Sequence, residues 1–175
     1  MSRSVDLLMQ QAVEREVFPA ASLVVGLEGK MIHQGYYGKA RKGMCFDIAS
    51  LTKPVCTATL IQILVQEKKL CLGDPLTKWL SRAKQPVHKK ITIEYLLSHT
   101  AGFPSWKSYY RELPLEAIGK PSGKEHILRS ILAEPLFNEP GKICEYSDLG
   151  FILLGEILER AGGKSLDLLF YEKKW

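Results

Sequence analysis

The sequence predicts an α+β protein in which one helix and a β-hairpin come before a long helical segment. Apolar residues recur at helical spacing over residues 4–16, two β-rich runs follow at 22–25 and 31–36, and helical patterns dominate from residue 50 onward. The chain has 175 residues, of which 46% are hydrophobic and 25% are charged, a balance typical of globular domains. One domain is therefore the default expectation.

The first helix and the hairpin are predicted from local signals. Ser4 is placed to cap the helix, and Asp6 lies in its first turn. The two strand runs are joined through residues 27–30, where Gly29 can supply a positive φ. These signals predict two antiparallel strands with a tight turn.

The segment from Ser50 to Lys68 predicts a central helix. Its residues are apolar nearly all round the helix, which favours burial. Pro54 would break a helix in its middle but is tolerated in the first turn, where amides lack intrahelical partners. The helix is therefore expected to begin close to Ser50.

Capping and stop signals predict further helices along the chain. Thr92 caps one of them, and Ser122 with Glu125 forms a capping box for another. Gly162 or Gly163 ends the longest, because glycine readily adopts the left-handed conformation at a helix end. The expected ranges are 76–80, 93–97, 122–133, 148–160 and a last helix from Ser165 to Trp175.

Composition excludes several functional classes. Net charge is +5, but the basic residues are scattered among acids, so nucleic-acid binding is not expected. No apolar run approaches the ~18 residues that a membrane helix needs, and the N-terminus has no export signal, which favours a cytoplasmic location. The cysteines and histidines are widely spaced, so no metal and no cofactor is expected. Cys56 and Cys71 are expected to be reduced and to behave as small apolar side chains.

The main chemical signal is a serine and a lysine three residues apart at the start of the central helix. This spacing places Ser50 and Lys53 on one face, within reach of each other. A serine hydroxyl becomes a nucleophile when a base accepts its proton, and a lysine amine can serve if burial lowers its pKa. The apolar residues that follow are expected to bury Lys53. The alternative interpretation is a capping serine followed by an exposed lysine.

A second element, residues 140–150, lies on a predicted turn before a helix and carries Tyr-Ser-Asp at 146–148. Together with Ser-x-x-Lys at 50–53, it resembles the serine β-lactamase and penicillin-recognising family, most closely the class C branch with its related D,D-peptidases and esterases. Residues 91–103 and 153–165 resemble further segments of that family, in the expected order. The resemblance covers essentially the whole chain and implies a β-lactamase/transpeptidase-like fold.

The resemblance also implies roles for four residues. Ser50 would be the acylated nucleophile, and Lys53 would be its hydrogen-bonded base partner. Tyr146 would share proton transfer with Lys53. Asp148 stands where the family usually has asparagine, a residue that contacts the lysine or the substrate. A carboxylate at this position favours a charged Lys53.

His99 allows a different interpretation, because serine, histidine and aspartate can form a catalytic triad. A structural histidine that orders the loop after a short helix is the favoured alternative. The sequence therefore predicts a structural role for His99.

The family's third motif, a Lys-Thr-Gly or His-x-Gly strand, does not follow Tyr146 in this sequence. The resemblance therefore implies that residues 1–175 are a single partial domain, an N-terminal fragment of the fold. Residues 1–49 would supply a helix and hairpin of the α/β part, and residues 50–175 would supply the nucleophile helix and most of the helical subdomain. Self-association, or complementation by a C-terminal segment, is expected to cover the exposed strand edges and apolar surfaces.

The expected function is that of an acyl-serine hydrolase that works through a covalent acyl-enzyme on Ser50. Small-molecule esters, β-lactams or D-Ala-D-Ala peptides are the candidate substrates, and the apparent lack of an export signal favours an esterase. The alternative is a non-catalytic or degenerate β-lactamase-like module, inactive as this fragment.

Overall fold

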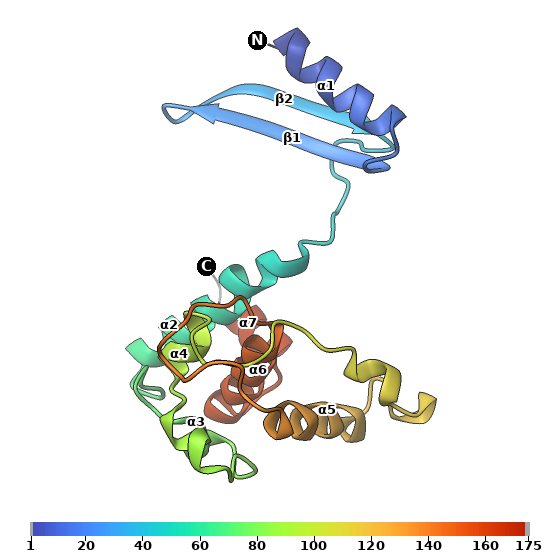
Figure 1. The fold of residues 1–175 in the computed structure, drawn as a ribbon. Helices are drawn as coiled ribbons and strands as arrows, with labels where there is room; N and C mark the ends of the chain where they lie inside the picture. The colour runs from blue at the N-terminus through green and yellow to red at the C-terminus, as the bar shows by residue number, and fades with distance from the viewer. Residues whose placement is uncertain (1, 174–175) are drawn as a thin grey trace. The chain divides into compact units, whose positions relative to one another are not determined.

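The computed structural model describes residues 2–173, which divide into two compact units between Ile48 and Ala49 (Figure 1). Trp175, the expected end of the last helix, lies outside the described residues. The elements found in the two units confirm the predicted α+β class.

The first unit is a helix on a two-stranded antiparallel sheet (Figure 1). Its elements are α1 (Ser2–Glu14), β1 (Ala20–Leu27) and β2 (Lys30–Gly38). The two-residue turn between the strands has Glu28 at φ 49° and Gly29 at φ 74°, and two positive φ values match the twist of a tight hairpin. The predicted hairpin is therefore confirmed, with longer strands than the sequence indicated.

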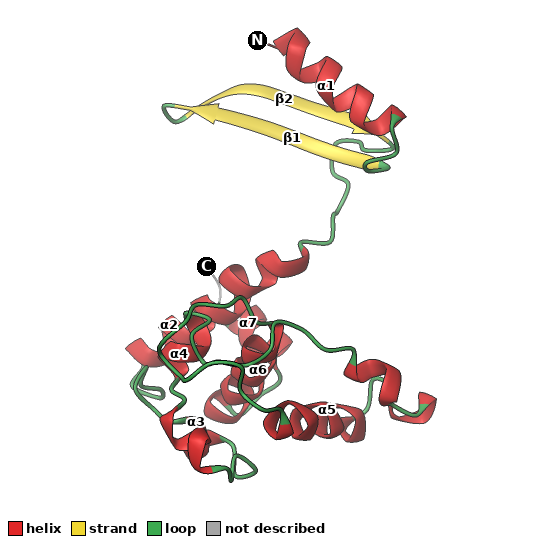
Figure 2. Ribbon diagram, viewed as in Figure 1, coloured by secondary structure: helices red, strands yellow, loops and turns green. Residues whose placement is uncertain are grey.

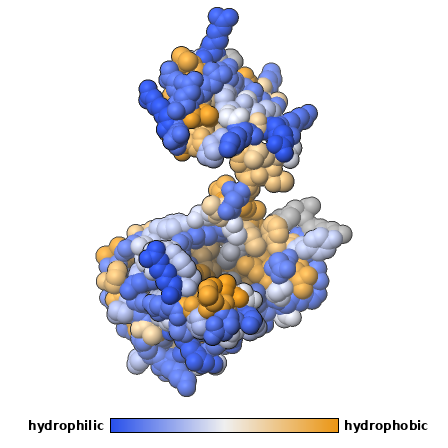
Figure 3. All heavy atoms as spheres, turned by 90° about the vertical axis from the view of Figure 1, so that its right-hand side faces the viewer, coloured by the Kyte–Doolittle hydropathy of each residue, from blue (hydrophilic) through white to orange (hydrophobic). Residues whose placement is uncertain are grey.

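A buried tyrosine fixes α1 against this sheet. Tyr37 donates a hydrogen bond to Asp6 Oδ1 at 2.6 Å, and its hydroxyl lies 2.8 Å from His33 Nε2. The hydrogen bond to Asp6 raises the pKa of Tyr37 to about 12. On the other face of the hairpin Val24 and Ile32 are exposed. Figure 3 shows hydrophobic residues, in orange, among mainly hydrophilic ones on the face in view.

The second unit consists of helices, short helical turns and loops (Figure 2). Among the described residues, four short 3-10 turns and one π-helical turn accompany its longer helices. The bounds are η1 (Ala49–Leu51), η2 (Lys53–Ala58), α2 (Thr59–Gln66), α3 (Leu76–Trp79), η3 (Pro86–Lys90), α4 (Ile93–Leu97), η4 (Tyr109–Glu112), η5 (Leu115–Ala117), α5 (Pro121–Ala133), α6 (Asp148–Gly162) and α7 (Leu166–Glu172).

Helix α6 forms the centre of this unit. It contacts η2 and the helices α2, α3, α4, α5 and α7. Its buried side chains include Leu153, Leu154 and Ile157, each fully enclosed. The helix ends at Gly163, whose φ of 70° is the left-handed conformation expected at a glycine stop. The predicted helix over 148–160 is confirmed, and it carries Asp148 at its first position.

The segment after Ser50 is less regular than a single helix. A 3-10 turn is followed by the π-helical turn η2 and then by α2. Pro54 has no N–H to donate, and the Thr59 hydroxyl donates to Pro54 O at 2.8 Å, one position beyond regular α spacing. Thr57 is the first buried residue of this segment and Leu60 its first buried apolar residue, whereas Val55 is exposed. Helical structure therefore begins close to Ser50 as predicted, but as a succession of 3-10, π and α segments in place of one regular helix.

Two smaller predictions were wrong. Helix α5 begins at Pro121 with no side-chain cap, because proline pre-sets φ at the first helical position. Glu125 pairs with Arg82 and Arg129 in place of a capping box. All four cysteines are free thiols as predicted, but Cys71 is exposed, because the loop before α3 turns it away from the core. By contrast, Thr92 caps α4 as predicted, accepting from Tyr95 N at 3.2 Å.

Within residues 2–173, none of the helices combines the length and the apolar character needed to cross a membrane.

Candidate active site

Ser50 and Lys53 meet at the irregular start of the central helical segment. Lys53 Nζ donates a hydrogen bond to Ser50 Oγ at 3.2 Å. Ala49, directly before the serine, has φ 44°, a conformation that non-glycine residues adopt rarely and that is common at functional sites. Ser50 is exposed, whereas the Lys53 side chain is only 16% exposed. The serine is thus accessible to a ligand while the amine is held beneath it.

Two residues from the other end of the unit complete the cluster. Tyr146, on the loop before α6, donates its hydroxyl proton to Ser50 Oγ at 3.0 Å. Asp148, the first residue of α6, lies 2.6 Å from Lys53 Nζ through Oδ1. The serine oxygen therefore accepts two hydrogen bonds at once, as many as its lone pairs allow. The structure brings together all four residues that the sequence singled out.

A network of backbone contacts positions Tyr146 and Asp148. Between them Ser147 is buried, and its hydroxyl donates to Pro104 O at 2.7 Å while accepting from Gly150 N at 3.4 Å. Asp148 N donates to Ser105 O at 2.8 Å. The residues before α6 are therefore tied to the loop that follows α4.

His99 belongs to this framework. Its Nδ1 accepts a hydrogen bond from Ser147 N at 3.1 Å, and its ring lies 4.6 Å from the Tyr146 ring between centroids. Burial, reinforced by the charge of Lys53, lowers the pKa of His99. A neutral ring with Nδ1 as acceptor fits this geometry. The predicted structural role of His99 is confirmed.

The charges of the cluster are coupled. Burial acts to lower the pKa of Lys53, but hydrogen bonds to Asp148 and Tyr146 outweigh it, and the pKa is raised. The pKa of Tyr146 is lowered, first by its hydrogen bond with Lys53 and then by that with Ser50. The condition under which the amine itself would act as the base, a lowered pKa of Lys53, is therefore not met, because an anionic partner lies in contact. The expectation that Asp148 favours a charged lysine is confirmed.

A cavity of about 350 Å³ opens beside this cluster. Ser50, Lys53 and Asp148 line it, together with the aromatic side chains of Trp106 and Phe151. Lys53 Nζ also lies 5.0 Å from the centroid of the Tyr146 ring. Over the described part of the chain, no cluster of histidine, cysteine or carboxylate side chains is arranged to hold a metal ion.

Sequence reasoning missed Ser147 and the two aromatic residues that line the cavity, Trp106 and Phe151. A serine directly before a helical pattern is an N-cap signal that was available for Ser147. Trp106 lies on a loop and Phe151 lies in α6, and no local sequence pattern indicates that either side chain lines the cavity. Their positions depend on contacts between distant segments.

The four-residue cluster and the fold define a class. Residues 5–175 match the Beta-lactamase family, and the chain belongs to this family. It is 32% identical to an N-acetylmuramyl-L-alanine amidase of Bacillus subtilis, over 91% of this chain and 42% of that protein. It is 27% identical to the esterase EstB of Burkholderia gladioli, over 95% of this chain and 47% of that protein.

Solved structures also match most of this chain over only part of their own length. The octameric penicillin-binding protein homologue from Pyrococcus abyssi superimposes with a TM-score of 0.80 at 23% identity, covering 98% of this chain and 41% of that one. The predicted β-lactamase/transpeptidase-like fold is thereby confirmed. The chain spans less than half the length of the curated relatives named above.

Proposed function

We propose that this protein is an acyl-serine hydrolase in which Ser50 forms a covalent acyl-enzyme with small esters or amides. The observation that carries the proposal is the Ser50 oxygen held between the Lys53 amine and the Tyr146 hydroxyl, at 3.2 and 3.0 Å. A nucleophile within hydrogen-bond reach of a base, with the base held by a third group, is the arrangement that covalent catalysis requires.

Tyr146 is the proposed base in the first half of the reaction. Its lowered pKa favours the phenolate, and the charged Lys53 beside it stabilises that form. The phenolate takes the Ser50 proton as Oγ bonds to the substrate carbonyl carbon. Tyr146 then gives this proton to the departing alcohol or amine, which leaves the acyl group on Ser50.

The second half of the reaction reverses these roles. Water attacks the acyl carbon while the Tyr146 phenolate accepts a proton from the water. Tyr146 then gives this proton to Ser50 Oγ as the bond between Oγ and the acyl carbon breaks, which releases the acid and restores the phenolate. Lys53 keeps its positive charge throughout and offsets the negative charge that forms on Tyr146. Asp148 holds Lys53 in that charged state through the 2.6 Å ion pair.

Esters are the preferred substrate class in this proposal. The relatives include a protein named as an esterase and another named as an amidase, and both names denote cleavage of an acyl group. An ester has the better leaving group, so it places the smaller demand on proton donation by Tyr146. The cytoplasmic location indicated by the sequence stays a prediction.

The alternative is a non-catalytic module, which the raised pKa of Lys53 favours if the amine itself must act as the base. A fluorophosphonate probe separates the two, because it bonds covalently to an activated serine without needing turnover. Mass spectrometry should find one adduct on Ser50, absent in Ser50→Ala and retained in a matched control, Ser81→Ala, at an exposed serine. If the wild-type chain is folded and the probe does not label it, the non-catalytic alternative holds.

Self-association is a further part of the proposal. Val24 and Ile32 on the hairpin are exposed, as are Leu27 and Met31 at its turn. Exposed apolar side chains on a strand pair with open edges favour pairing with another copy or another segment. Light scattering over a range of concentrations should show a dimer or larger species, and a monomer at every concentration would exclude it.

A further inference from the structure

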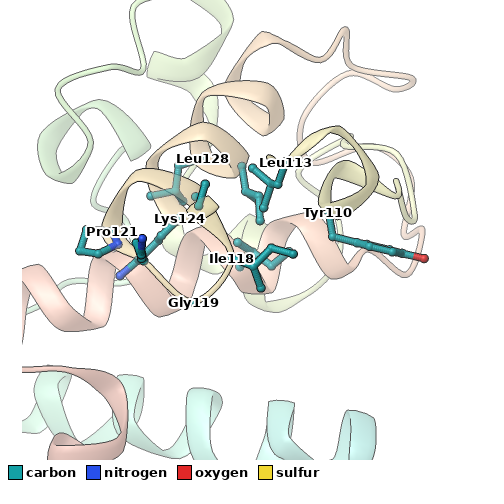
Figure 4. Close-up of a pocket in the computed structure, with 12 residues that line it drawn as sticks. Tyr110, Leu113, Ile118, Gly119, Pro121, Lys124 and Leu128 are labelled. Carbon is teal, nitrogen blue, oxygen red and sulfur yellow. The ribbon is translucent and has the colours of Figure 1, made fainter. Parts of the chain in front are cut away.

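A second cavity in the helical unit, of about 890 Å³, has walls made mainly of hydrocarbon (Figure 4). It is formed by the chain from η4 to the first turns of α5, with Tyr110, Leu113, Ile118 and Leu128 among its walls. This volume is typical of sites that enclose small organic molecules. Apolar walls bind apolar groups, because burial removes hydrocarbon surface from water.

One residue lines both this cavity and the cavity of the proposed active site. Ile152 lines both the large cavity and the smaller one beside Ser50. It lies four residues after Asp148 in α6, so the two side chains stand on one face, with Cβ atoms about 5–6 Å apart. Ile152 is 41% exposed, which leaves its side chain accessible from this face. The apolar cavity therefore begins one helical turn from the ion pair that holds Lys53.

Two charged residues, Lys120 and Lys124, line the cavity beside the apolar walls. Lys124 is the charged residue that α5 contributes to the wall beside α6, and its ammonium already pairs with Glu156 and Glu159 of α6. Its positive charge is thus balanced locally. An occupant gains mainly from contact with the apolar walls.

We propose that this cavity binds the apolar acyl chain of the substrate that acylates Ser50, which makes medium- and long-chain acyl esters the substrate class. The inference rests on the proposed function for the covalent step. The acyl carbon remains bonded to Ser50 after the alcohol departs, so the chain attached to that carbon needs a place to lie through both halves of the reaction. The large cavity, which shares Ile152 with the cavity beside Ser50, offers such a place.

Binding of alkyl carboxylates to the whole chain tests the cavity without any chemistry. Calorimetry with butanoate, hexanoate, octanoate and decanoate should show the dissociation constant falling about three- to four-fold for each added methylene that enters the cavity. Equal affinity for butanoate and decanoate would overturn the proposal.

A pair of variants assigns the binding to this cavity. Ile118 lines the cavity and is 56% exposed, so Ile118→Glu introduces a charge at the wall without burying it in the core. Leu115 is 85% exposed on the neighbouring turn η5 and does not line the cavity, so Leu115→Glu is the matched control. Ile118→Glu should weaken decanoate binding at least about tenfold and flatten the dependence on chain length. Leu115→Glu should change neither.

Circular dichroism should show both variants folded, and the milder Ile118→Ser should act in the same direction. An unchanged chain-length dependence in Ile118→Glu would overturn the proposal, since the carboxylates would then bind elsewhere.

The covalent step is tested separately with two esters that share a leaving group. Mass spectrometry should show p-nitrophenyl octanoate acylating Ser50 about tenfold or more faster than p-nitrophenyl acetate, with the ratio falling towards one in Ile118→Glu. A ratio that is the same in both chains would overturn the assignment of the acyl chain to this cavity. Absence of acylation by either ester would contradict the proposed function. Binding of decanoate to Ser50→Ala would still show whether the cavity takes an alkyl chain.

Discussion

The Lys53 amine and the Asp148 carboxylate are 2.6 Å apart, and the same amine donates to Ser50 Oγ. A single amine thus links the proposed nucleophile to an acidic residue at the start of α6. The ion pair raises the pKa of Lys53, whereas the hydrogen bond from Lys53 lowers the pKa of Tyr146. The two proton-carrying groups are therefore separated in function: the amine stays charged, and the phenol becomes the more acidic partner.

Replacing Asp148 by asparagine should move the pH dependence of the reaction. The carboxylate acts to raise the pKa of both Lys53 and Tyr146, so its removal lowers both. Whichever of them is the base, the rising limb of the rate against pH should shift to lower pH in Asp148→Asn. The rate of fluorophosphonate labelling measured across pH checks this. Glu116→Gln, at an exposed carboxylate that lines neither the cavity beside Ser50 nor the larger one, should leave the limb in place, and a shift to higher pH would contradict the argument.

The Tyr146 hydroxyl should be needed for reactivity but not for folding. Tyr146→Phe removes the oxygen that donates to Ser50 and leaves the ring that packs beside His99. Loss of a general acid and base should slow labelling of Ser50 by a factor of about 10²–10⁴. Tyr171→Phe, at an exposed tyrosine of α7, provides the comparison and should label at the wild-type rate. Equal labelling rates in the two variants would remove Tyr146 from the mechanism.

Much of the fold was predictable from sequence because it depends on local signals. The hairpin, the cap at Thr92 and the long helix α6 each follow from patterns within a few residues. The pairing of Ser50 with Lys53 was equally local, since three residues separate them. The π-helical turn was not predictable in this way, because the consequence of Pro54 depends on how the Thr59 hydroxyl and the core below it are satisfied.

The placement of Tyr146 came from resemblance rather than from spacing. It lies 96 residues from Ser50, and no local pattern fixes a contact over that length. The contacts that hold its loop run from His99 and Pro104 to Ser147, a pairing of two distant segments. The direction of the Lys53 pKa was predicted only where the charge of Asp148 was considered, because burial alone gave the opposite sign.

His88 should make the protein less stable in mild acid. Its side chain is buried, and neither ring nitrogen makes a hydrogen bond of ordinary geometry with the described residues. Burial lowers the pKa of His88, against a weaker opposing effect from the backbone of Ala83. As pH falls below ~6.5, the unfolded chain binds a proton that the folded chain resists, so stability is lost, by at most about 1.4 kcal/mol per pH unit for this group.

The variant His88→Phe tests this. It replaces the ring by an apolar one of similar size, so the midpoint of urea unfolding at pH 7 should rise or stay constant. Between pH 7 and pH 5, the midpoint should fall less than in the wild type. Identical pH dependence in the two proteins would show that His88 is not the group that titrates.

Replacing Gly102 should cost more stability than replacing Gly119, although both glycines have similar positive φ values. Gly102 has φ 86°, and a Cβ there would lie 2.2 Å from Asn138 O. Gly119 has φ 72°, but a Cβ there would have nothing within 4 Å. Gly119→Ala should therefore cost about 1–2 kcal/mol for the left-handed backbone alone, and Gly102→Ala should cost about 1–3 kcal/mol more through overpacking. Urea unfolding of both variants measures the difference, and equal losses would mean that the 102 and 138 segments separate easily.

Ser147 should couple the stability of α6 to the geometry of the site. Its hydroxyl is buried and links Pro104 O to Gly150 N, so alanine leaves a backbone carbonyl and an amide without this partner. The variant Ser147→Ala should lose about 1–3 kcal/mol of stability. Because Tyr146 and Asp148 flank it directly, labelling of Ser50 should slow as well, although alanine touches neither the serine nor the probe.

The serine before α7 is the matched control: Ser165 occupies the same position relative to its helix but makes no side-chain cap to it, so Ser165→Ala should change stability little and labelling not at all. Slower labelling in Ser147→Ala at a temperature where circular dichroism shows the chain fully folded would assign the effect to positioning, and unchanged labelling there would show that the Pro104 contact does not orient Tyr146.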